Sequence, residues 1–243
     1  MVGTGIFLGA VLNALFPRRC VACGSKIGAG DRFTSVCNRC FAGIPRTTHL
    51  VCLTCGRRAI ALRSVCHPRL GATLAAATGY AAPAVQALVK ALKYEGRRDA
   101  ALPLATLIKE QLALLLPVTG APRAPFPLVP VPLHRSRERT RGFNQSFLIA
   151  DALGRLLPGA VAIAPGLLLR ERRTVSQTEC ADRLARERNV AGGFAVPNPE
   201  RVRGKTVILV DDVCTSGATA REAARELRKA GAAVVIAATA ARA

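Results

Sequence analysis

Hydrophobic and small residues in the last third of the chain follow the order strand, helix, strand. Residues 207–210 are four consecutive aliphatic residues, which is typical of a strand buried on both faces of a parallel sheet. Gly217 then precedes a segment, 218–230, whose apolar side chains fall on one side of a helix. Gly231 ends that helix, and the run 232–238 predicts the next strand. This pattern predicts a βαβ unit, in which ligands bind at the carboxyl ends of the strands.

Similar patterns place further elements upstream. Apolar residues at helical spacing predict a helix over 85–92 that is capped at Gly96, and a second helix is expected from Ser146 onward. Residues 128–133 predict a strand that leads into a charged loop. The two ends of 167–196 predict short strands around a polar excursion that is too long for a tight turn.

Composition limits the possible classes of protein. With 50% hydrophobic residues among 243 and a mean hydropathy of +0.26, the chain can form a packed core, so wholesale disorder is excluded. It has 35 Lys and Arg against 15 Asp and Glu, a net charge of +20, which indicates anionic partners such as nucleic acid or phosphorylated small molecules. Residues 1–70 hold ten basic residues and one acid, so nearly half of the excess lies there. Aromatic residues make up only 4%, which argues against an aromatic stacking platform for single-stranded nucleic acid.

The first sixteen residues are apolar but carry no sign of a targeting segment. They lack a basic flank and a small-residue cleavage site, and the run is too short to span a bilayer. We therefore expect a cytoplasmic protein without a transmembrane segment. In that compartment, nine cysteines indicate metal ligands or free thiols rather than a disulfide framework.

Four cysteines form two Cys-x2-Cys pairs separated by thirteen residues: Cys20, Cys23, Cys37 and Cys40. Two such turns place four thiolates around the tetrahedral sphere that Zn²⁺ prefers. Free buried thiols would leave the paired spacing unexplained, so structural zinc is the favoured interpretation. The spacing predicts a zinc ribbon over residues 1–70.

A second cysteine set is less complete. Cys52 and Cys55 form another such pair, and Cys66 follows, but the position three residues later is Arg69. His67 is adjacent to Cys66, and neighbouring side chains rarely point at one metal. Two interpretations stay open. The set is either a complete second metal site, which would make the ribbon double, or a Cys-x2-Cys turn that has lost part of its ligand set.

The candidate phosphate chemistry follows the strand at 207–210. Two carboxylates come first, and small and hydroxyl residues then lead into the helix: Asp211, Asp212, Val213, Cys214, Thr215, Ser216, Gly217, Ala218 and Thr219. Backbone N–H groups at a helix N-terminus can hold a phosphate, and the carboxylates can accept hydrogen bonds from ribose hydroxyls, directly or through water on Mg²⁺. The alternative is a turn followed by a threonine helix cap. It would explain the two acids and the cap, but not the order of all the residues from 211 to 219.

Residues 207–219 resemble the signature for 5-phosphoribosyl-1-pyrophosphate (PRPP) of type I phosphoribosyltransferases. Three further segments are similar to motifs of the ComF family: Phe16-Pro17-x2-Cys20-x2-Cys23-Gly24, Ala91-Leu92-Lys93-Tyr94, and a proline-rich strand followed by Arg141-Gly142-Phe143-Asn144-Gln145-Ser146. The resemblance covers essentially the whole chain. It implies an α/β domain over 71–243 with the type I phosphoribosyltransferase-like fold, a Rossmann-like and mostly parallel sheet flanked by helices, behind a small N-terminal zinc ribbon.

The resemblance also implies a reaction and its residues. PRPP would bind with Mg²⁺, and its phosphoribosyl group would pass to an unidentified acceptor with release of pyrophosphate. Asp211, Asp212 and Arg141 are then the catalytic candidates. The loop after the first core strand and a flexible loop within 167–196 would contact pyrophosphate or close over PRPP, through Arg139, Arg141, Asn144, Gln145, Gln177 and Arg188.

Several alternatives stay open beside this interpretation. The arginine-rich run 135–141 could be a solvated charged face, and for Lys93 a surface position is the safer expectation. The segment that selects the acceptor is expected within 71–115. ComF relatives are implicated in DNA uptake during natural transformation, so single-stranded DNA and DNA-uptake proteins are candidate partners. The alternative function is a non-catalytic protein that binds single-stranded DNA or senses PRPP.

Overall fold

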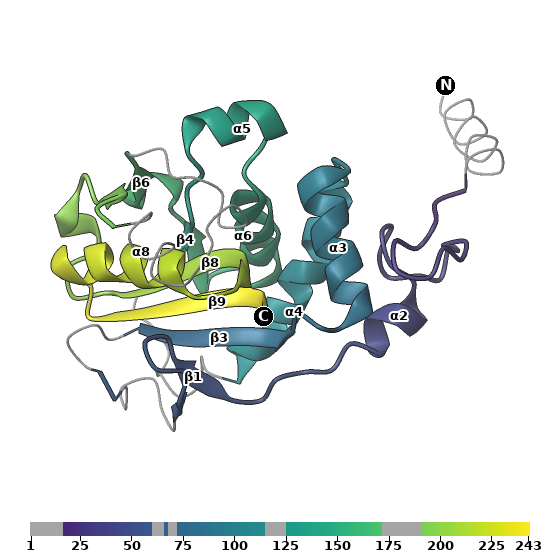
Figure 1. Ribbon diagram of the computed structural model, residues 1–243, viewed down its shortest axis with the longest axis horizontal. Coiled ribbons are helices and arrows are strands. Elements are labelled where there is room, and N and C mark those ends of the chain that lie inside the picture. Colours follow the sequence, from purple (N-terminus) through teal and green to yellow (C-terminus); the bar gives the residue numbers. More distant parts are fainter. Residues whose placement is uncertain (1–16, 60–65, 68–71, 115–124, 172–190) are drawn as a thin grey trace.

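The structure is a computed structural model, and it describes residues 17–59, 66–67, 72–114, 125–171 and 191–243. In this part of the chain seven strands form one sheet in the order β2-β1-β3-β9-β8-β4-β5. Their bounds are Leu50–Cys52 for β1, Arg58–Ala59 for β2, Ala72–Gly79 for β3, Phe126–Pro130 for β4, Val161–Ile163 for β5, Thr206–Cys214 for β8 and Val234–Arg242 for β9. The five strands from β3 to β5 in that order run parallel, and β1 and β2 add antiparallel strands beyond β3 (Figure 1).

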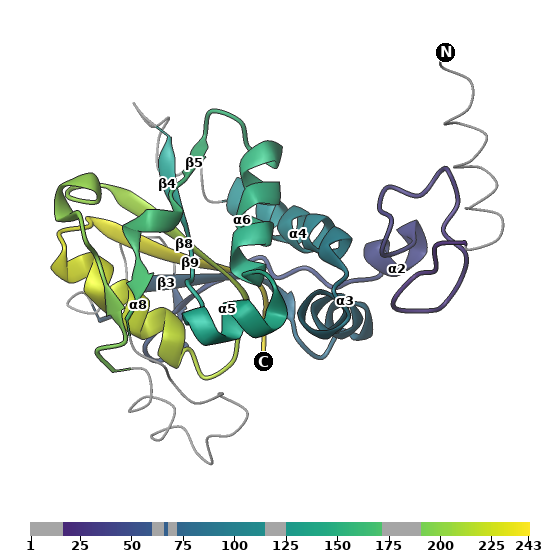
Figure 2. The same ribbon diagram turned by 90° about the horizontal axis from the view of Figure 1, so that it is seen from above.

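Helices cover both faces of this sheet. Three of them pack on one face and one on the other (Figure 2): α3 (Pro83–Tyr94), α4 (Ala101–Ala113) and α6 (Gln145–Leu156) opposite α8 (Ala218–Lys229). The described remainder contains short elements: α2 (Asn38–Ala42), α5 (Arg135–Arg141), the 3-10 turns η1 (Arg98–Ala100), η3 (Pro165–Leu167) and η4 (Pro199–Arg201), and a separate antiparallel pair of β6 (Leu169–Arg170) and β7 (Phe194–Ala195). The predicted mostly parallel α/β fold is confirmed.

The position of strand β8 in the sheet explains why residues 207–210 are all apolar and do not alternate with polar residues. Val207 and Leu209 pack in the layer beneath α8, whereas Ile208 and Val210 pack beneath α3, α4 and α6. All four side chains are buried, because helices cover both faces of a parallel sheet. The predicted βαβ unit of β8, α8 and β9 is therefore present, and it places the acidic pair at the carboxyl end of a core strand.

One expectation about local structure was wrong. The charged run 135–141 is the helix α5 and not a loop; His134 accepts a hydrogen bond from the backbone N–H of Ser136 at its start, and Gly142 ends it in the left-handed conformation at φ 78°. The segment 71–115 begins with β3 in the sheet itself, and its part in selecting the acceptor stays a prediction.

Other predictions fall outside the described residues. The polar excursion predicted within 167–196 includes residues 172–190, so Gln177 and Arg188 lie in a part that the structure does not describe, as does the apolar segment 1–16. In the described parts of the chain, no helix is long and apolar enough to cross a membrane.

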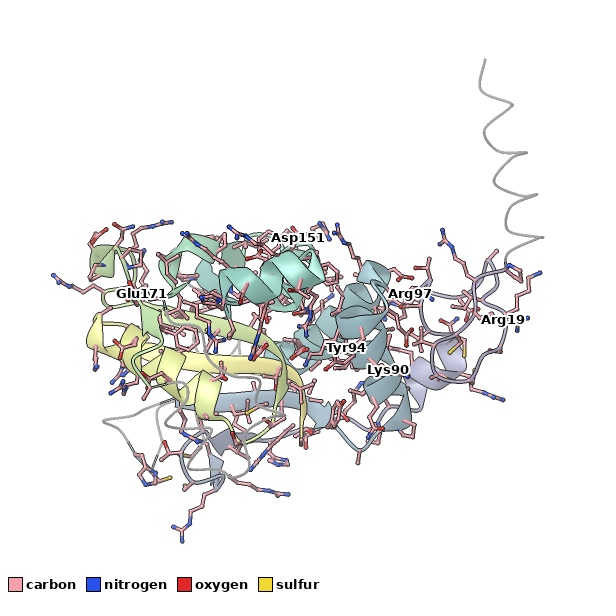
Figure 3. All side chains as sticks on the ribbon, turned by 45° about the horizontal axis from the view of Figure 1, so that its top comes forward. Arg19, Lys90, Tyr94, Arg97, Asp151 and Glu171 are labelled. Atoms are coloured by element: carbon pink, nitrogen blue, oxygen red, sulfur yellow. The ribbon has the colours of Figure 1, made fainter. Side chains whose placement is uncertain are left out.

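The first cysteine segment is attached to the body of the protein by polar contacts. The Thr34 hydroxyl donates to Asp99 at 3.0 Å, and the Arg97 guanidinium donates to the Thr34 carbonyl at 3.2 Å and to Asp99 at 2.9 Å. Arg46 pairs with Glu110 at 2.6 Å. In Figure 3, Arg97 lies on the side of the body that faces the segment carrying Arg19. Domain limits at 1–70 and 71–243 stay a prediction, and β1 and β2 belong to the same sheet as β3.

Candidate functional site

A cleft of about 810 Å³ opens at the carboxyl end of β8. Its floor includes Asp211 and Asp212, and its walls come from α3, from the start of α6 and from α5. Five basic side chains line it: Lys90, Lys93, Arg137, Arg141 and Arg170. The cleft therefore combines two carboxylates with an excess of positive charge, which suits an anionic ligand that also carries hydroxyl groups.

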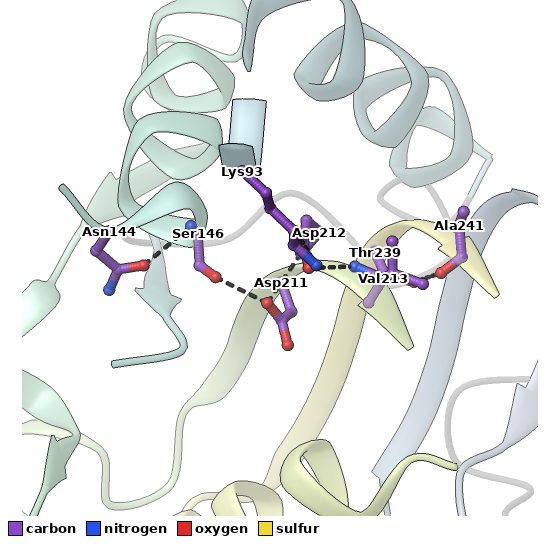
Figure 4. Close-up of polar contacts among 8 residues, drawn as sticks. All are labelled: Lys93, Asn144, Ser146, Asp211, Asp212, Val213, Thr239 and Ala241. Carbon is purple, nitrogen blue, oxygen red and sulfur yellow. Dashed lines mark hydrogen bonds and ion pairs between the residues drawn. The ribbon is translucent and has the colours of Figure 1, made fainter. Parts of the chain in front are cut away.

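Asp211 is held from the α6 side of the cleft. The Ser146 hydroxyl donates to its Oδ1 at 2.8 Å, and the backbone N–H of Asp212 donates to the same oxygen at 2.9 Å (Figure 4). Burial, reinforced by the negative charge of Asp212, raises the pKa of Asp211 to about 6. This carboxyl therefore changes its charge close to physiological pH.

Asp212 is held from the α3 side. Lys93 extends from the last turn of α3 and places its Nζ 2.6 Å from Asp212 Oδ2 (Figure 4), and the backbone N–H of Val213 donates to the other oxygen at 2.7 Å. Burial works against the charged ammonium, but the ion pair with Asp212 outweighs it and raises the pKa of Lys93 above its ordinary value. The expectation of a surface lysine was wrong. The signal was in the sequence, because Val85, Val89 and Lys93 continue one helical stripe at i, i+4 spacing.

The arginines of the cleft, Arg137, Arg141 and Arg170, come from two elements, α5 and β6. Burial, together with the neighbouring charge of Arg137, lowers the pKa of Arg170 to about 10. The Arg141 guanidinium lies over the Tyr94 ring, 5.7 Å from its centroid. Like charges gathered from α5 and β6 repel one another, so an anion bound between them would relieve that repulsion.

The predicted phosphate loop joins β8 to α8. Gly217 is its turning point, at φ 75° in the left-handed region, and it is the N-cap of α8. Thr215 and Thr219 line the same cleft as the two carboxylates. The loop and the acidic pair therefore face one ligand space, with the positive end of the α8 dipole directed toward it.

The first cysteine set fits a tetrahedral zinc ion. The four sulfurs of Cys20, Cys23, Cys37 and Cys40 all lie within 4.8 Å of one another, and Cys23 and Cys37 Sγ are 3.8 Å apart. Zinc–sulfur bonds of about 2.3 Å at tetrahedral angles place neighbouring sulfurs about 3.8 Å apart. Buried Phe33 and Phe41 pack beside these ligands with ring centroids 4.6 Å apart.

The second cysteine set is also complete, with a histidine as its fourth ligand. Cys52, Cys55, Cys66 and His67 place one ligand atom each within 4.8 Å of one another. His67 Nδ1 lies 3.7 Å from Cys52 Sγ and 3.3 Å from Cys66 Sγ. The objection to His67 was therefore wrong: the chain between these two neighbours turns so that both side chains reach one point.

Comparisons with known proteins agree with both halves of the chain. A model of the phosphoribosyl transferase domain matches residues 145–243, and a model of the double zinc ribbon domain matches residues 11–69. The DNA utilization protein YhgH of Escherichia coli K12 is 32% identical over 225 residues, which cover 90% of this chain and 94% of that protein. The chain belongs to the ComF/YhgH family.

Two further relatives match over shorter stretches. The YhgH protein of Salmonella typhi is 37% identical over 153 residues, 63% of this chain and 65% of that relative. Competence protein ComFC of Bacillus subtilis is 37% identical over 106 residues, 44% of this chain and 40% of that protein. The chain thus belongs to a family whose named members include DNA utilization and competence proteins, and it has a phosphoribosyltransferase fold and cysteine clusters that support structural zinc.

The structure gathers some of the residues predicted for this ComF/YhgH site and separates others. Arg141 and Gln145 line the cleft, whereas Arg139 is exposed on α5 outside it. Asn144 caps α6 by accepting from the Ser146 N–H at 3.0 Å, and it lines a neighbouring cavity of about 740 Å³. Cys214 is buried away from the cleft, and burial raises the pKa of its thiol to about 11.

The predicted set lacked several residues that line the cleft. Among them are Lys93, Arg137, Ser146 and Arg170. Ser146 and Arg137 lie inside motifs that the sequence singled out, so their position in the motif was the available signal. Arg170 lies at the edge of the polar excursion, and only the pairing of β6 with β7 places it against the cleft.

Proposed function

We propose that the cleft binds PRPP with Mg²⁺ and supports displacement of pyrophosphate from the ribose anomeric carbon. The observation that carries this proposal is the shared ligand space of the two carboxylates, the loop with Gly217 and the cationic wall. A phosphorylated sugar that carries a pyrophosphate group has the matching parts: vicinal hydroxyls for the acids, one phosphate for the loop and a second anionic group for the arginines.

Each part of the site has a role in that reaction. Asp211 and Asp212 orient the ribose through its hydroxyls, and residues 215–219 hold the 5′-phosphate at the start of α8. Arg137, Arg141 and Arg170 stabilise the departing pyrophosphate, which leaves with the electron pair of the bond to the anomeric carbon. The acceptor supplies the new pair and gives up its proton. Asp211 and Asp212 would hold Mg²⁺, directly or through water, and the ion would supply further charge neutralisation on the leaving group.

Calorimetric titration tests the binding step. PRPP with Mg²⁺ is expected to bind the wild-type protein, and the double substitution Asp211→Asn/Asp212→Asn is expected to abolish the signal, because amides cannot supply the lost negative charge. Arg155, an exposed residue of α6 paired with Asp151, offers a matched control as Arg155→Gln. Absence of binding to the wild type overturns the proposal. Pyrophosphate release screened across nucleobases and amines then identifies the acceptor class.

The pH dependence of PRPP affinity should follow Asp211. Its pKa of about 6 is above the ordinary value, so the ionised form is lost as the pH falls through 6. We expect the dissociation constant to rise about tenfold per pH unit below that point. The Ser146 hydrogen bond favours the ionised form, so Ser146→Ala should move the midpoint to higher pH.

Asp211→Asn is the control for this pH profile, because PRPP itself also titrates in this range. Calorimetry at several pH values measures both proteins. A wild-type profile identical in slope to that of Asp211→Asn would assign the whole dependence to the ligand and contradict the role of this carboxyl.

A second candidate function is the handling of single-stranded DNA. The names of the relatives, DNA utilization and competence proteins, favour it, as does the basic excess of residues 1–70. If phosphates are neutralised by this surface, the logarithm of the affinity should fall with the logarithm of salt concentration by about 0.7 per phosphate contacted. An affinity for single-stranded DNA that does not change with salt concentration would contradict this candidate. The proposal of PRPP binding would be unaffected by that result.

A further inference from the structure

The second zinc ribbon lies against the back of the phosphate loop. Its Cys-x2-Cys turn, residues 52–56, and the loop residues 214–217 together line one cavity of about 90 Å³. Leu53 lies in the sequence between the ligands Cys52 and Cys55, and its side chain is buried. Its Cδ1 is 3.5 Å from the position that a Cβ atom on Gly217 would occupy. The metal-binding turn and the loop therefore face each other across this small cavity, and Leu53 of the turn lies against the loop.

Arg221 ties these two segments together. Its Nη1 donates to the Ser216 carbonyl of the loop at 2.8 Å and to the Leu53 carbonyl of the ribbon at 3.3 Å. Its own backbone N–H donates to the Gly217 carbonyl at 2.8 Å, so the same residue fixes the first turn of α8. One guanidinium thus sets the distance between a zinc-ligand turn and the loop that faces the cleft.

Two glycines let arginine side chains approach the backbone closely in this region. A Cβ on Gly217 would stand 2.9 Å from Arg221 Nη1, and a Cβ on Gly56 would stand 3.0 Å from Arg242 Nη2. Both glycines have positive φ, at 75° and 74°, so the close approach coincides with the two turning points. A shift of the metal-binding turn therefore reaches the loop through Arg221, whose Nη1 bonds a carbonyl of each segment.

We propose that metal occupancy of the second ribbon sets the conformation of the phosphate loop through Leu53 and Arg221. The effect on affinity rests on the proposed PRPP function. With zinc bound, Cys52 and Cys55 hold the Leu53 carbonyl where Arg221 reaches it. When the metal is lost, Arg221 loses one of these two carbonyl acceptors, and the loop loses its apolar support.

The first ribbon provides a matched comparison. It is attached to the opposite part of the body, through Asp99 and Glu110. Substitution of one ligand in each site, Cys66→Ser for the second and Cys23→Ser for the first, should remove one zinc ion per chain in either case. Both cysteines are exposed, so neither change opens a cavity in the core.

Hydrogen exchange and calorimetry on the full-length variants test the coupling. Cys66→Ser should increase amide exchange in residues 212–222 and weaken PRPP binding at least tenfold, whereas Cys23→Ser should leave both unchanged. Exchange in β9 reports whether each variant keeps its sheet, and metal analysis counts the zinc. Loss of zinc from Cys66→Ser with wild-type exchange in 212–222 would overturn the proposal.

Arg221→Met tests the connection without touching a metal ligand. This variant should keep both zinc ions and still weaken PRPP binding, with faster exchange in the loop. Arg228→Met is its control, because Arg228 lies at the far end of α8 and donates to the Ala232 carbonyl. Wild-type exchange and affinity in Arg221→Met would contradict the proposal. If the wild type binds no PRPP, the proposed function fails, while the exchange comparison still decides the coupling.

Discussion

Lys93→Met is expected to lower both the stability of the protein and its affinity for PRPP. The side chain of Asp212 is only 7% exposed and that of Lys93 24%, so removing the cation leaves a buried carboxylate without its partner. Breaking one side of such a pair costs about 3–5 kcal/mol. The affinity should fall at least tenfold, because two carboxylates on the cleft floor would then repel an anionic ligand without a neighbouring ammonium. Chemical denaturation measures the stability, and calorimetry measures the affinity.

The double variant Lys93→Met/Asp212→Asn separates these two effects. It removes both charges, so most of the lost stability should return, whereas PRPP binding should stay weak. Lys229→Met is the control, since Lys229 lies at the end of α8, does not line the cleft and has a side chain that is 58% exposed. A Lys93→Met protein as stable as the wild type would show that the ion pair does not hold the acidic pair in place.

Removal of zinc from the first ribbon is expected to unfold that segment while the sheet survives. Its buried side chains are few, so the metal must supply much of its folding free energy, and structural zinc in such peptides contributes apparent values of about 10–16 kcal/mol. Cys37→Ser should therefore abolish protection from hydrogen exchange in residues 20–44. Protection in β8 and β9 should persist, because those strands pair within the body.

Metal analysis and peptide-resolved exchange measure this outcome together. The control is Cys214→Ser, which removes a buried thiol that belongs to neither cysteine cluster. Full protection of residues 20–44 in a Cys37→Ser protein that has lost its zinc would contradict a metal-dependent ribbon.

The core of the fold could be predicted because its signals are local. Four aliphatic residues, a glycine at each end of the following helix and a second apolar run define β8, α8 and β9 without reference to the rest of the chain. The helix α5 could not be found in this way. Its residues, Arg135–Arg141, include no apolar side chain, so hydrophobic periodicity gives no sign of a helix. Only the cap at His134 and the turn at Gly142 define its ends.

The site was predictable where one segment supplies it and not where several meet. Asp211 and Asp212 stand out as a pair after a core strand, but the partners that hold them, Lys93 and Ser146, are brought in by two different helices. His67 was discounted by a rule about sequence neighbours, yet the path of the chain decides whether both side chains reach one point. The sequence pattern does not reveal contacts between residues that are far apart in the chain.

The two short strands of the second ribbon also protect an edge. β1 and the residues around it run along β3, with hydrogen bonds from Leu53 to Ala72 and from Thr47 to Ala77. A fragment that begins at residue 71 would leave the amide and carbonyl groups on that side of β3 without partners. Exposed edges of this kind template pairing with other chains. The metal-binding segment therefore also covers an edge of the sheet that would otherwise be open, and truncation at that boundary should yield an aggregation-prone protein.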